Sequence, residues 1–415
     1  MTNQYSTIPN GWRVTTLGQL ANKIVDNRGK TPLITDRGFE LLEVNSISEQ
    51  QRQPDYSKVS KFVNEETFNT WFRTGNINEN DILIPTVGTI GNVSFSKLSR
   101  GAIAQNLIAF RTNRSMAEPL LLYYLLKSPI YKNQLLKLDI GGVQPSIKVP
   151  HLLALEVCIP LLPEQQAITA VLSSLDDKIE LLREQNKTLE ATAQAIFKEW
   201  FVNFNFPGNT GKMIDSELGE IPEGWRVGSL SGIATFLNGL ALQKYPPESN
   251  LEYLPVVKIK EMSSGFTEKS DKASAKLDKK YIVKDGDVLF SWSGTLMVDL
   301  WKYGTGALNQ HLFKVTSTQY SKWFYYYWTK EHLQSFQQTA SAKAVTMGHI
   351  QRHHLDDALV AIPDKDFMSL ANQLLDPLIN KFIGNNTQMQ SLENIRNILL
   401  PKLMRGEVRV KGFDN

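Results

Sequence analysis

The stretch LLPEQQAITAVLSSLDDKIELLREQNKTLEATAQAIFKEWF, residues 161–201, predicts one long helix. Its apolar residues recur at alternating steps of four and three, which is the 3.5-residue period of a coiled-coil seam. An amphipathic helix on a globular core would need only a short seam and would follow a 3.6-residue period, so we favour a coiled coil. The predicted seam residues are Ile168, Leu172, Leu175, Ile179, Leu182, Asn186, Leu189, Ala193, Ile196 and Trp200.

A second, less regular seam follows near the C-terminus. Asn385 and Arg396 interrupt its apolar positions, and Pro377 is expected to kink the helix. Two seams in one chain are expected to pair with each other, and the simplest closed arrangement is antiparallel. Asn186 either fixes the register of the pair or is a polar residue tolerated near water. The seam residues predicted here are Ala371, Leu375, Leu378, Phe382, Met389, Leu392 and Leu399.

The regions that precede the two helices repeat each other. IPNGWRV at 8–14 and IPEGWRV at 221–227 match at six of seven positions. A solenoid would need at least three shorter units, so we interpret the chain as two copies of one unit. Three more pairs of similar segments follow in the same order: NENDILIPTVGTIG (78–91) with KDGDVLFSWSGTL (284–296), GAIAQNLIAF (101–110) with GALNQHLFKV (306–315), and LALEVCIP (153–160) with DDALVAIP (356–363).

Each copy has the same predicted plan. Short strands bounded by glycine-containing turns come first, and AIAQNLIAF at 102–110 is expected to be one of them. A helix near 119–128 or 321–336 follows, and then a last strand before the long helix. The expected fold class is α/β (α+β): two similar globular domains joined by two long helices in an antiparallel coiled coil, with a pseudo-two-fold internal repeat. The expected boundaries are 1–160 for the first domain, 161–202 for the first helix, 203–220 for a connector, 221–363 for the second domain, and 364–415 for the second helix and tail.

Composition excludes several classes of protein. The 415 residues carry a net charge of only +3, and the single cysteine, Cys158, rules out a disulfide framework. The N-terminus has no apolar signal region, and no apolar run is long enough to span a membrane, so we expect a cytoplasmic protein without a membrane partner.

No arrangement of catalytic residues is apparent. GKT at 29–31 lacks the earlier glycine of a phosphate-binding loop, since Ile24 occupies that place. His349 and His353 have a spacing that could hold a metal, but the glutamate of HExxH is missing, and a basic loop facing DNA is the favoured alternative. We predict no catalytic residue and no metal site in this chain.

The sequence strongly resembles the DNA-specificity (S) subunit of type I restriction–modification systems. The resemblance covers essentially the whole chain. It rests on the IPLLPEQQ entry to the first helix, its KEWF exit, the SELGEIPEGW opening of the second copy, and LLPKLMRGEVRV at 399–410. The second helix departs from the family's entry pattern, having IPDKDFMSLAN at 362–372.

The resemblance implies a non-catalytic, sequence-specific DNA-binding subunit. Its two target-recognition domains would read the two halves of a bipartite target in double-stranded DNA. It would position two modification subunits, which methylate adenine N6, together with restriction subunits that are translocases and nucleases. No cofactor is expected in this chain, whereas S-adenosylmethionine, ATP and magnesium are expected in the partner subunits. The alternative is a structural adaptor that binds no nucleic acid and bridges two protein partners through its coiled-coil rod.

The DNA-binding residues are expected in polar loops that interrupt apolar strands. Glutamine and asparagine can bond adenine with two hydrogen bonds, and lysine and arginine can reach guanine or phosphate. The candidates are Lys30, Thr31, Gln105, Asn106, Gln144, Ser146 and Lys148 in the first copy, and Asn309, Gln310, His311, Lys343, Thr346, His349 and Arg352 in the second. Trp12 and Trp225 are interpreted as packing residues, and the aromatic run at 323–328 as core or subunit-facing.

Overall fold

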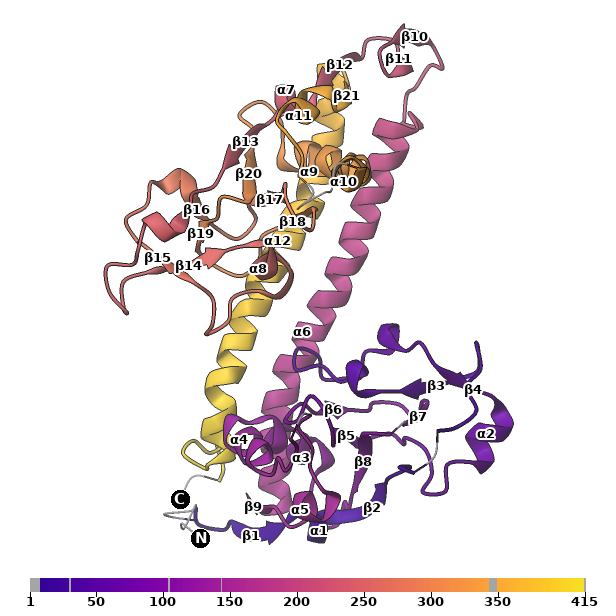
Figure 1. Cartoon of the computed structure of the whole chain (residues 1–415), viewed down its shortest axis with the longest axis vertical. Coiled ribbons are helices and arrows are strands. Elements are labelled where there is room, and N and C mark those ends of the chain that lie inside the picture. Colours follow the sequence, from indigo (N-terminus) through magenta and orange to yellow (C-terminus); the bar gives the residue numbers. More distant parts are fainter. Residues whose placement is uncertain (1–7, 30, 104, 143, 343–348, 414–415) are drawn as a thin grey trace. The chain divides into compact units, whose positions relative to one another are not determined.

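The computed structural model describes residues 8–29, 31–103, 105–142, 144–342 and 349–413. The chain divides into two compact units (Figure 1). Unit 1 comprises the chain up to Lys178 together with the segment from Leu392 onward, and unit 2 comprises Ile179–Ser391. No helix in the described part of the chain has the length and apolar character needed to cross a bilayer.

Unit 1 contains two small sheets beside a terminal strand pair. A four-stranded sheet has the order β2-β8-β5-β6, a three-stranded sheet has the order β4-β3-β7, and β1 pairs with β9. The strands are β1 (Arg13–Thr16), β2 (Ala21–Val25), β3 (Phe39–Leu42), β4 (Phe62–Val63), β5 (Ile82–Pro85), β6 (Ser94–Phe95), β7 (Ala102–Ile103), β8 (Leu107–Thr112) and β9 (Glu156–Ile159). The helices are α1 (Leu17–Leu20), α2 (Glu65–Thr70), α3 (Pro119–Lys127), α4 (Pro129–Lys137) and α5 (Val149–Leu153).

Unit 2 repeats this arrangement. Its sheets have the orders β13-β20-β17-β18 and β15-β14-β19-β16, and β12 pairs with β21. The strands are β12 (Arg226–Ser229), β13 (Thr235–Asn238), β14 (Leu254–Val257), β15 (Lys272–Ala273), β16 (Ile282–Val283), β17 (Val288–Ser291), β18 (Met297–Leu300), β19 (Gly306–Leu308), β20 (Leu312–Thr316) and β21 (Leu359–Ile362). The helices are α7 (Leu230–Ile233), α8 (Ile259–Ser264), α9 (Lys322–Glu331), α10 (Leu333–Ala342) and α11 (His353–Asp357).

The register of the strand pairs shows that the two units correspond residue by residue. In unit 1, β3 pairs in parallel with β7, with Leu41 opposite Ala102. In unit 2, β14 pairs in parallel with β19, with Val256 opposite Ala307. The central antiparallel pairs β5·β8 and β17·β20 also correspond. The predicted duplication is therefore confirmed as two similar α/β units.

Two sequence predictions of single elements were wrong in detail. The stretch 102–110 forms two strands, because β7 belongs to one sheet and β8 to the other, and Asn106 turns the chain between them at a φ of 74°. The stretch 321–336 forms α9 and α10 rather than one helix. The segment interpreted as a connector contains β10 (Met213–Ser216), which forms a hairpin with β11 (Gly219–Pro222).

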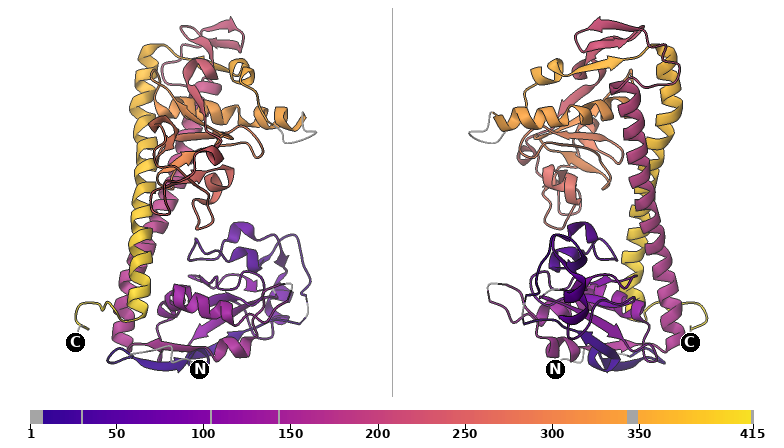
Figure 2. Two further views of the ribbon diagram at one scale, coloured as in Figure 1. Left: turned by 60° about the vertical axis from the view of Figure 1, so that its left-hand side comes forward. Right: turned by 90° about the vertical axis from the view of Figure 1, so that its right-hand side faces the viewer.

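Two long helices run antiparallel to each other, as predicted (Figures 1 and 2). Helix α6 spans Leu162–Phe197 and continues as a π-helical turn over Lys198–Val202. Helix α12 spans Lys365–Met404 and is continuous through Pro377. Within unit 1 the start of α6 lies near the end of α12. Within unit 2 the end of α6 lies near the start of α12.

The predicted seam of α6 is the inward face of that helix. Its buried members are Ile168, Leu172, Ile179, Leu182, Asn186 and Ala193, and its half-buried members are Leu175, Leu189, Ile196 and Trp200. In α12 the buried face contains Ala371, Leu375, Ile379, Phe382, Asn385 and Asn386, and later Leu400 and Leu403. The predicted residues Leu378, Met389, Leu392 and Leu399 are half-buried. The buried face of α12 thus deviates from the predicted spacing at its centre.

The repeated IPxGW segments have a packing role. Trp225 is buried among Phe201, Phe206 and Phe367, with ring centroids 5.1–5.7 Å away. Trp12 lies against Gly406, just after the end of α12. Each segment therefore packs its tryptophan near the C-terminal end of a long helix. In both units the strand that follows pairs with the last strand of the same unit, β1 with β9 and β12 with β21.

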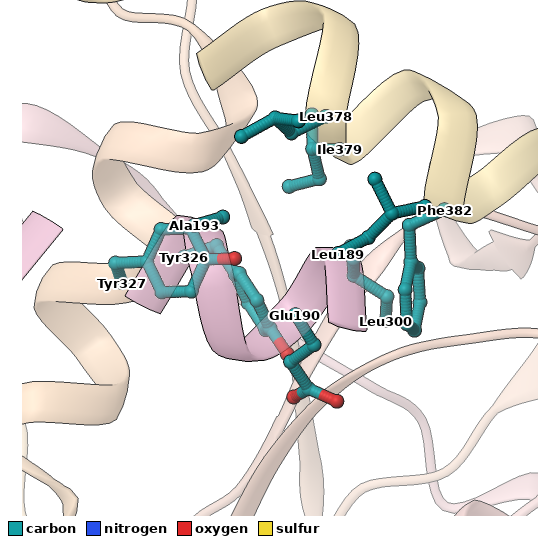
Figure 3. Close-up of a pocket in the computed structure, with 9 residues that line it drawn as sticks. All are labelled: Leu189, Glu190, Ala193, Leu300, Tyr326, Tyr327, Leu378, Ile379 and Phe382. Carbon is teal, nitrogen blue, oxygen red and sulfur yellow. The ribbon is translucent and has the colours of Figure 1, made fainter. Parts of the chain in front are cut away.

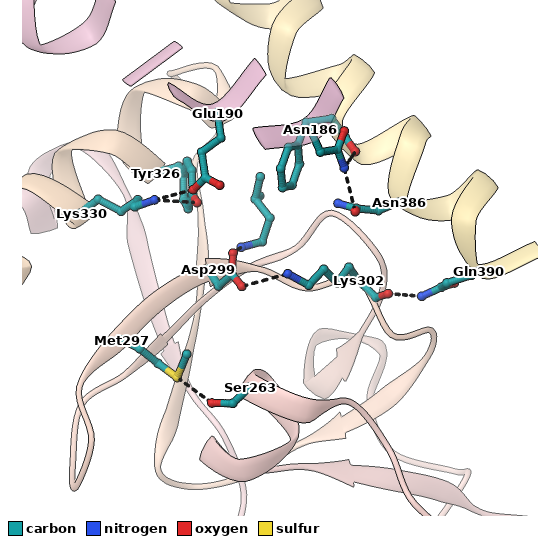
Figure 4. A network of polar contacts seen from close by, with 12 residues as sticks. Asn186, Glu190, Ser263, Met297, Asp299, Lys302, Tyr326, Lys330, Asn386 and Gln390 are labelled. Carbon is teal, nitrogen blue, oxygen red and sulfur yellow. Dashed lines mark hydrogen bonds and ion pairs between the residues drawn. The ribbon is translucent and has the colours of Figure 1, made fainter. Parts of the chain in front are cut away.

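In unit 2 a small hollow lies between the two helices and α9 (Figure 3). Its wall is apolar apart from Glu190 and two tyrosine hydroxyls, and Glu190 forms an ion pair of 2.7 Å with Lys330 (Figure 4). We interpret it as a gap in packing. The residues around it are Leu189, Glu190, Ala193, Leu300, Tyr326, Tyr327, Leu378, Ile379 and Phe382. The aromatic run 323–328 is buried in the core of unit 2.

Candidate nucleic-acid interface

Three loops meet where the central strand β5 ends in unit 1. The first directly follows β5 and comprises residues 86–91. The second is the turn at Gln105–Asn106, between β7 and β8. The third is the segment 139–148 between α4 and α5, described except for residue 143. We call these segments, and their counterparts in unit 2, the junction loops.

Backbone hydrogen bonds hold the three loops of unit 1 together. The Thr86 N–H donates to the Asn106 carbonyl at 2.8 Å, and the Ile147 N–H donates to the Thr86 carbonyl at 2.8 Å. Val87 forms an isolated β-bridge with Ser146. The backbone N–H of Thr86, directly after β5, is therefore bonded to the second loop, and its carbonyl is bonded to the third. We call Thr86 the junction residue of unit 1.

Unit 2 repeats these bonds at equivalent positions. The junction residue here is Trp292, directly after β17. Its N–H donates to the His311 carbonyl at 3.4 Å, and its carbonyl accepts from the Ile350 N–H at 3.0 Å. Ser293 forms a β-bridge with His349, as Val87 does with Ser146. The junction loops of unit 2 are 292–296, 309–311 and 349–352.

The two sets of junction loops share a backbone and differ in side chains. Unit 1 presents Asn106 and Ser146 where unit 2 presents His311 and His349. The junction residue itself changes from threonine to tryptophan. Loops that vary on a constant framework are a common way to place binding residues on a rigid scaffold. The geometry therefore provides two surfaces with the same backbone arrangement and different side chains.

The third loop of unit 1 is fixed by one carboxylate. Asp139 Oδ1 accepts hydrogen bonds from the backbone N–H groups of Ser146, at 2.7 Å, and Gly141, at 2.8 Å. These two bonds stabilise the charged form and lower the pKa of the Asp139 carboxyl below its ordinary value. The Asp139 carboxylate thus holds the loop through its backbone, although Gly141 and Gln144 at its tip are exposed.

The junction loops of unit 2 are fixed by side chains. Ser293 Oγ and His311 Nδ1 are 2.9 Å apart, and Gln310 Nε2 and His311 Nε2 are 3.3 Å apart. The Asn309 side chain accepts from the His311 N–H at 3.2 Å. Asn309 is buried at 7% exposure, so it supports the loop rather than offering its amide to a ligand.

The predicted DNA-binding residues fall into three groups. The junction loops contain Gln105, Asn106, Gln144, Ser146, Lys148, Asn309, Gln310, His311, His349 and Arg352. Thr31 is exposed in the loop after β2, outside the junction loops. Lys30, Lys343 and Thr346 lie outside the described residues.

The histidine pair considered for a metal site does not lie on one helix. His349 is in a β-bridge, and His353 is the first residue of α11. A spacing of four residues brings ligands together only within a helix. Among the described residues, no group of three or more histidine, cysteine, aspartate or glutamate side chains is arranged to hold a metal ion.

The model of the type I restriction modification DNA specificity domain matches the chain twice, at residues 9–191 and 222–394. The chain belongs to this family. It is a DNA specificity subunit of a type I restriction–modification system, the non-catalytic component of that enzyme. The two matches correspond to the two copies recognised in the sequence. This assignment contradicts the alternative of an adaptor without nucleic acid.

Similar proteins include two named specificity subunits. The MjaIX specificity subunit of Methanocaldococcus jannaschii is 30% identical over 299 residues, which cover 70% of this chain and 69% of that protein. The HindI specificity subunit of Haemophilus influenzae is 22% identical over 335 residues, covering 65% and 72%. The crystal structure of the type I S subunit from M. genitalium has a TM-score of 0.56 at 14% identity, covering 96% of this chain and 97% of that chain, and it shows the same fold.

The two junction residues of this specificity subunit are not among the residues predicted from its sequence. Thr86 and Trp292 stand in the paired segments TVGT and WSGT, so the repeat itself contained the signal. Asn238, whose side chain accepts from the Trp292 indole N–H at 3.0 Å, was not predicted either. That contact joins β13 to a loop more than fifty residues later in the chain, so no local sequence pattern predicts it.

Proposed function

We propose that each unit of this specificity subunit reads one half of a bipartite double-stranded DNA target through its junction loops. The observation that carries the proposal is the repeated backbone framework with exchanged side chains. Ser146 and His349 form equivalent β-bridges in the two units, yet their side chains could not make the same contacts with a base edge. Because base edges in the major groove differ in donors, acceptors and methyl groups, different side chains select different bases.

The proposal includes the division of labour in the complex. The chain binds DNA and positions two modification subunits that methylate adenine N6, and restriction subunits that translocate and cut. S-adenosylmethionine, ATP and magnesium act in those partners. Methylation requires the adenine to leave the duplex stack, so target selection falls to a separate surface. Residues 1–160 and 221–363 are proposed as the two recognition domains, 161–202 and 364–415 as the helical regions, and 203–220 as the connector.

The test is an exchange of one set of junction loops. Residues 86–91, 105–106 and 139–148 are replaced by those of a relative with a different target, and the subunit is assembled with its modification subunits in cells. Sequencing of methylated adenines should show one half-site changed and the other retained. The matched control is the corresponding exchange in unit 2, which should change only the other half. Changes in both half-sites after either exchange would contradict separate reading.

A further inference from the structure

The side chain of Trp292 is held in one orientation. Its indole N–H donates to Asn238 Oδ1, at 3.0 Å, from the end of β13. Its ring lies beside Phe313, with centroids 5.8 Å apart, and Phe313 is buried at 6% exposure. Together with the two backbone bonds of Trp292, these contacts fix the ring before any ligand arrives. Such preorganisation is what a specificity contact requires.

The half-buried indole lies at the surface formed by the junction loops. The rings of His311 and His349 are 6.0 Å and 6.4 Å from it, and His349 is exposed. Each of the three loops of unit 2 therefore contributes one aromatic residue to this cluster. Because the only polar atom of the indole is engaged by Asn238, the ring has only hydrocarbon left to offer.

That chemistry selects one kind of base edge. The major-groove edges of the four base pairs present donors and acceptors, and the one methyl group among them is the 5-methyl group of thymine. We propose that Trp292 determines specificity by contacting a thymine 5-methyl group in the half-site read by unit 2. This inference rests on the proposed function, since it assumes that the junction loops face the DNA.

Unit 1 offers a natural contrast. Its junction residue, Thr86, is 1% exposed, and its hydroxyl is buried without a hydrogen-bond partner in the described structure. A side chain so placed cannot reach a base methyl group. The thymine contact therefore belongs to one unit, and the half-site read by unit 1 serves as the internal control.

The experiment compares thymine with deoxyuridine, which lacks only the methyl group. The complete complex with its modification subunits is titrated against duplexes carrying its target, in which each thymine on either strand is replaced singly. With the native subunit, one replacement in the half-site of unit 2 should weaken binding about three- to five-fold, the effect of one buried methyl group. In Trp292→Ala that replacement should have no effect, and Trp292→Phe should retain part of it.

Two further variants separate positioning from general damage. Asn238→Ala releases the indole N–H and should reduce the effect of the methyl group without abolishing binding. Tyr245→Ala removes an aromatic residue that is 41% exposed elsewhere in unit 2 and should leave the effect unchanged. Replacements in the half-site of unit 1 should respond equally in all variants.

Two outcomes would overturn the inference. One is that no thymine in the half-site of unit 2 shows a methyl effect that disappears in Trp292→Ala. The other is a Trp292-dependent quenching of 2-aminopurine in the target, which would indicate stacking on an extrahelical base instead. Either result leaves the loop exchange intact as the test of the proposed function, so the two failures are distinguishable.

Discussion

Asn186 of α6 donates from Nδ2 to Oδ1 of Asn386 on α12, at 2.8 Å, inside the seam of unit 2 (Figure 4). Asn385 donates in turn to Asn186 Oδ1 at 2.9 Å. All three side chains are at most 7% exposed. A buried amide layer is satisfied in only one alignment of two helices, so it disfavours every other register. Asn186 and Asn385, the asparagines noted in the two seams, are therefore hydrogen-bond partners.

Breaking this layer from one side should destabilise the subunit. Asn186→Leu leaves the amides of Asn385 and Asn386 buried without that partner, which should cost roughly 1–3 kcal/mol of unfolding free energy. Replacing all three by leucine removes every unsatisfied group and should restore stability. Chemical denaturation of the single and triple variants measures the loss of unfolding free energy in the first and its recovery in the second. A triple variant no more stable than the single one would argue that these side chains are incidental.

A second buried network fixes the helices of unit 1. Asp176 accepts from the Tyr124 hydroxyl at 2.8 Å and from Arg396 Nη1 at 2.7 Å. Burial and the nearby negative charge of Asp176 raise the pKa of the Tyr124 hydroxyl well above its ordinary value. The hydroxyl therefore remains a donor at every physiological pH.

Removing Asp176 should be more damaging than removing an exposed partner. Asp176→Ala leaves the largely buried Arg396 guanidinium without its ion-pair partner, at a cost of about 3–5 kcal/mol. The matched control is Glu223→Ala, which breaks an ion pair with Lys212 whose two side chains are more than half exposed, and it should change stability little. Equal effects of the two substitutions in urea unfolding would contradict this ranking.

The sequence predicted the long helices and the repeat because both are patterns within the chain. The heptad steps of α6 and the two IPxGW segments need no tertiary information. A pattern within the chain was not enough for residues 102–110. Their β-structure is interrupted at Asn106 because β7 pairs in one sheet and β8 in the other. Local propensity favours one apolar strand there, and the competing requirement comes from partners elsewhere in the fold.

The buried face at the centre of α12 and the junction residues were not predicted, for related reasons. Ile379 and Asn386 are buried because of their partners on α6, whereas a heptad count favours Leu378. Trp292 reads as a strand residue in isolation. Its place among the junction loops depends on the bridge between Ser293 and His349 and on the hydrogen bond to Asn238. Contacts between distant segments leave no periodic trace in the sequence.

Stability should depend on pH through His332. Burial lowers the pKa of its imidazole, and the ring Nε2 is 2.8 Å from the Leu359 carbonyl, to which the neutral form donates. The imidazole of His332 therefore binds the proton that makes it positively charged more tightly in the unfolded chain than in the folded one. Stability is therefore fully present above the ordinary histidine pKa of about 6.5 and declines as pH falls through it.

Replacing this histidine should flatten that decline. In His332→Gln the amide can still donate to the Leu359 carbonyl but does not titrate. Between about pH 7 and pH 5.5 the unfolding free energy of the native subunit should fall more steeply than that of the variant. The other histidines are common to both proteins, so the difference isolates this group. Parallel curves would show that the protonation of His332 has no effect on folding.

Lys148 and Arg352 are predicted to bind DNA phosphates. Both are exposed in junction loops, directly before α5 and α11, at equivalent places in the two units. A phosphate contact releases a condensed counterion, so losing one should lower the slope of log affinity against log salt by about one. Lys148→Ala and Arg352→Ala should each do so and weaken binding similarly on target and non-target duplexes, and the double variant should lose about two. Titration of a labelled duplex with the assembled complex, between about 50 and 200 mM salt, measures the slope.

The control is Lys212→Ala, which removes a lysine of the exposed pair with Glu223 near the hairpin of β10 and β11 and should leave the salt slope unchanged. Slopes unaltered in both single variants would place the phosphate-binding surface outside the junction loops.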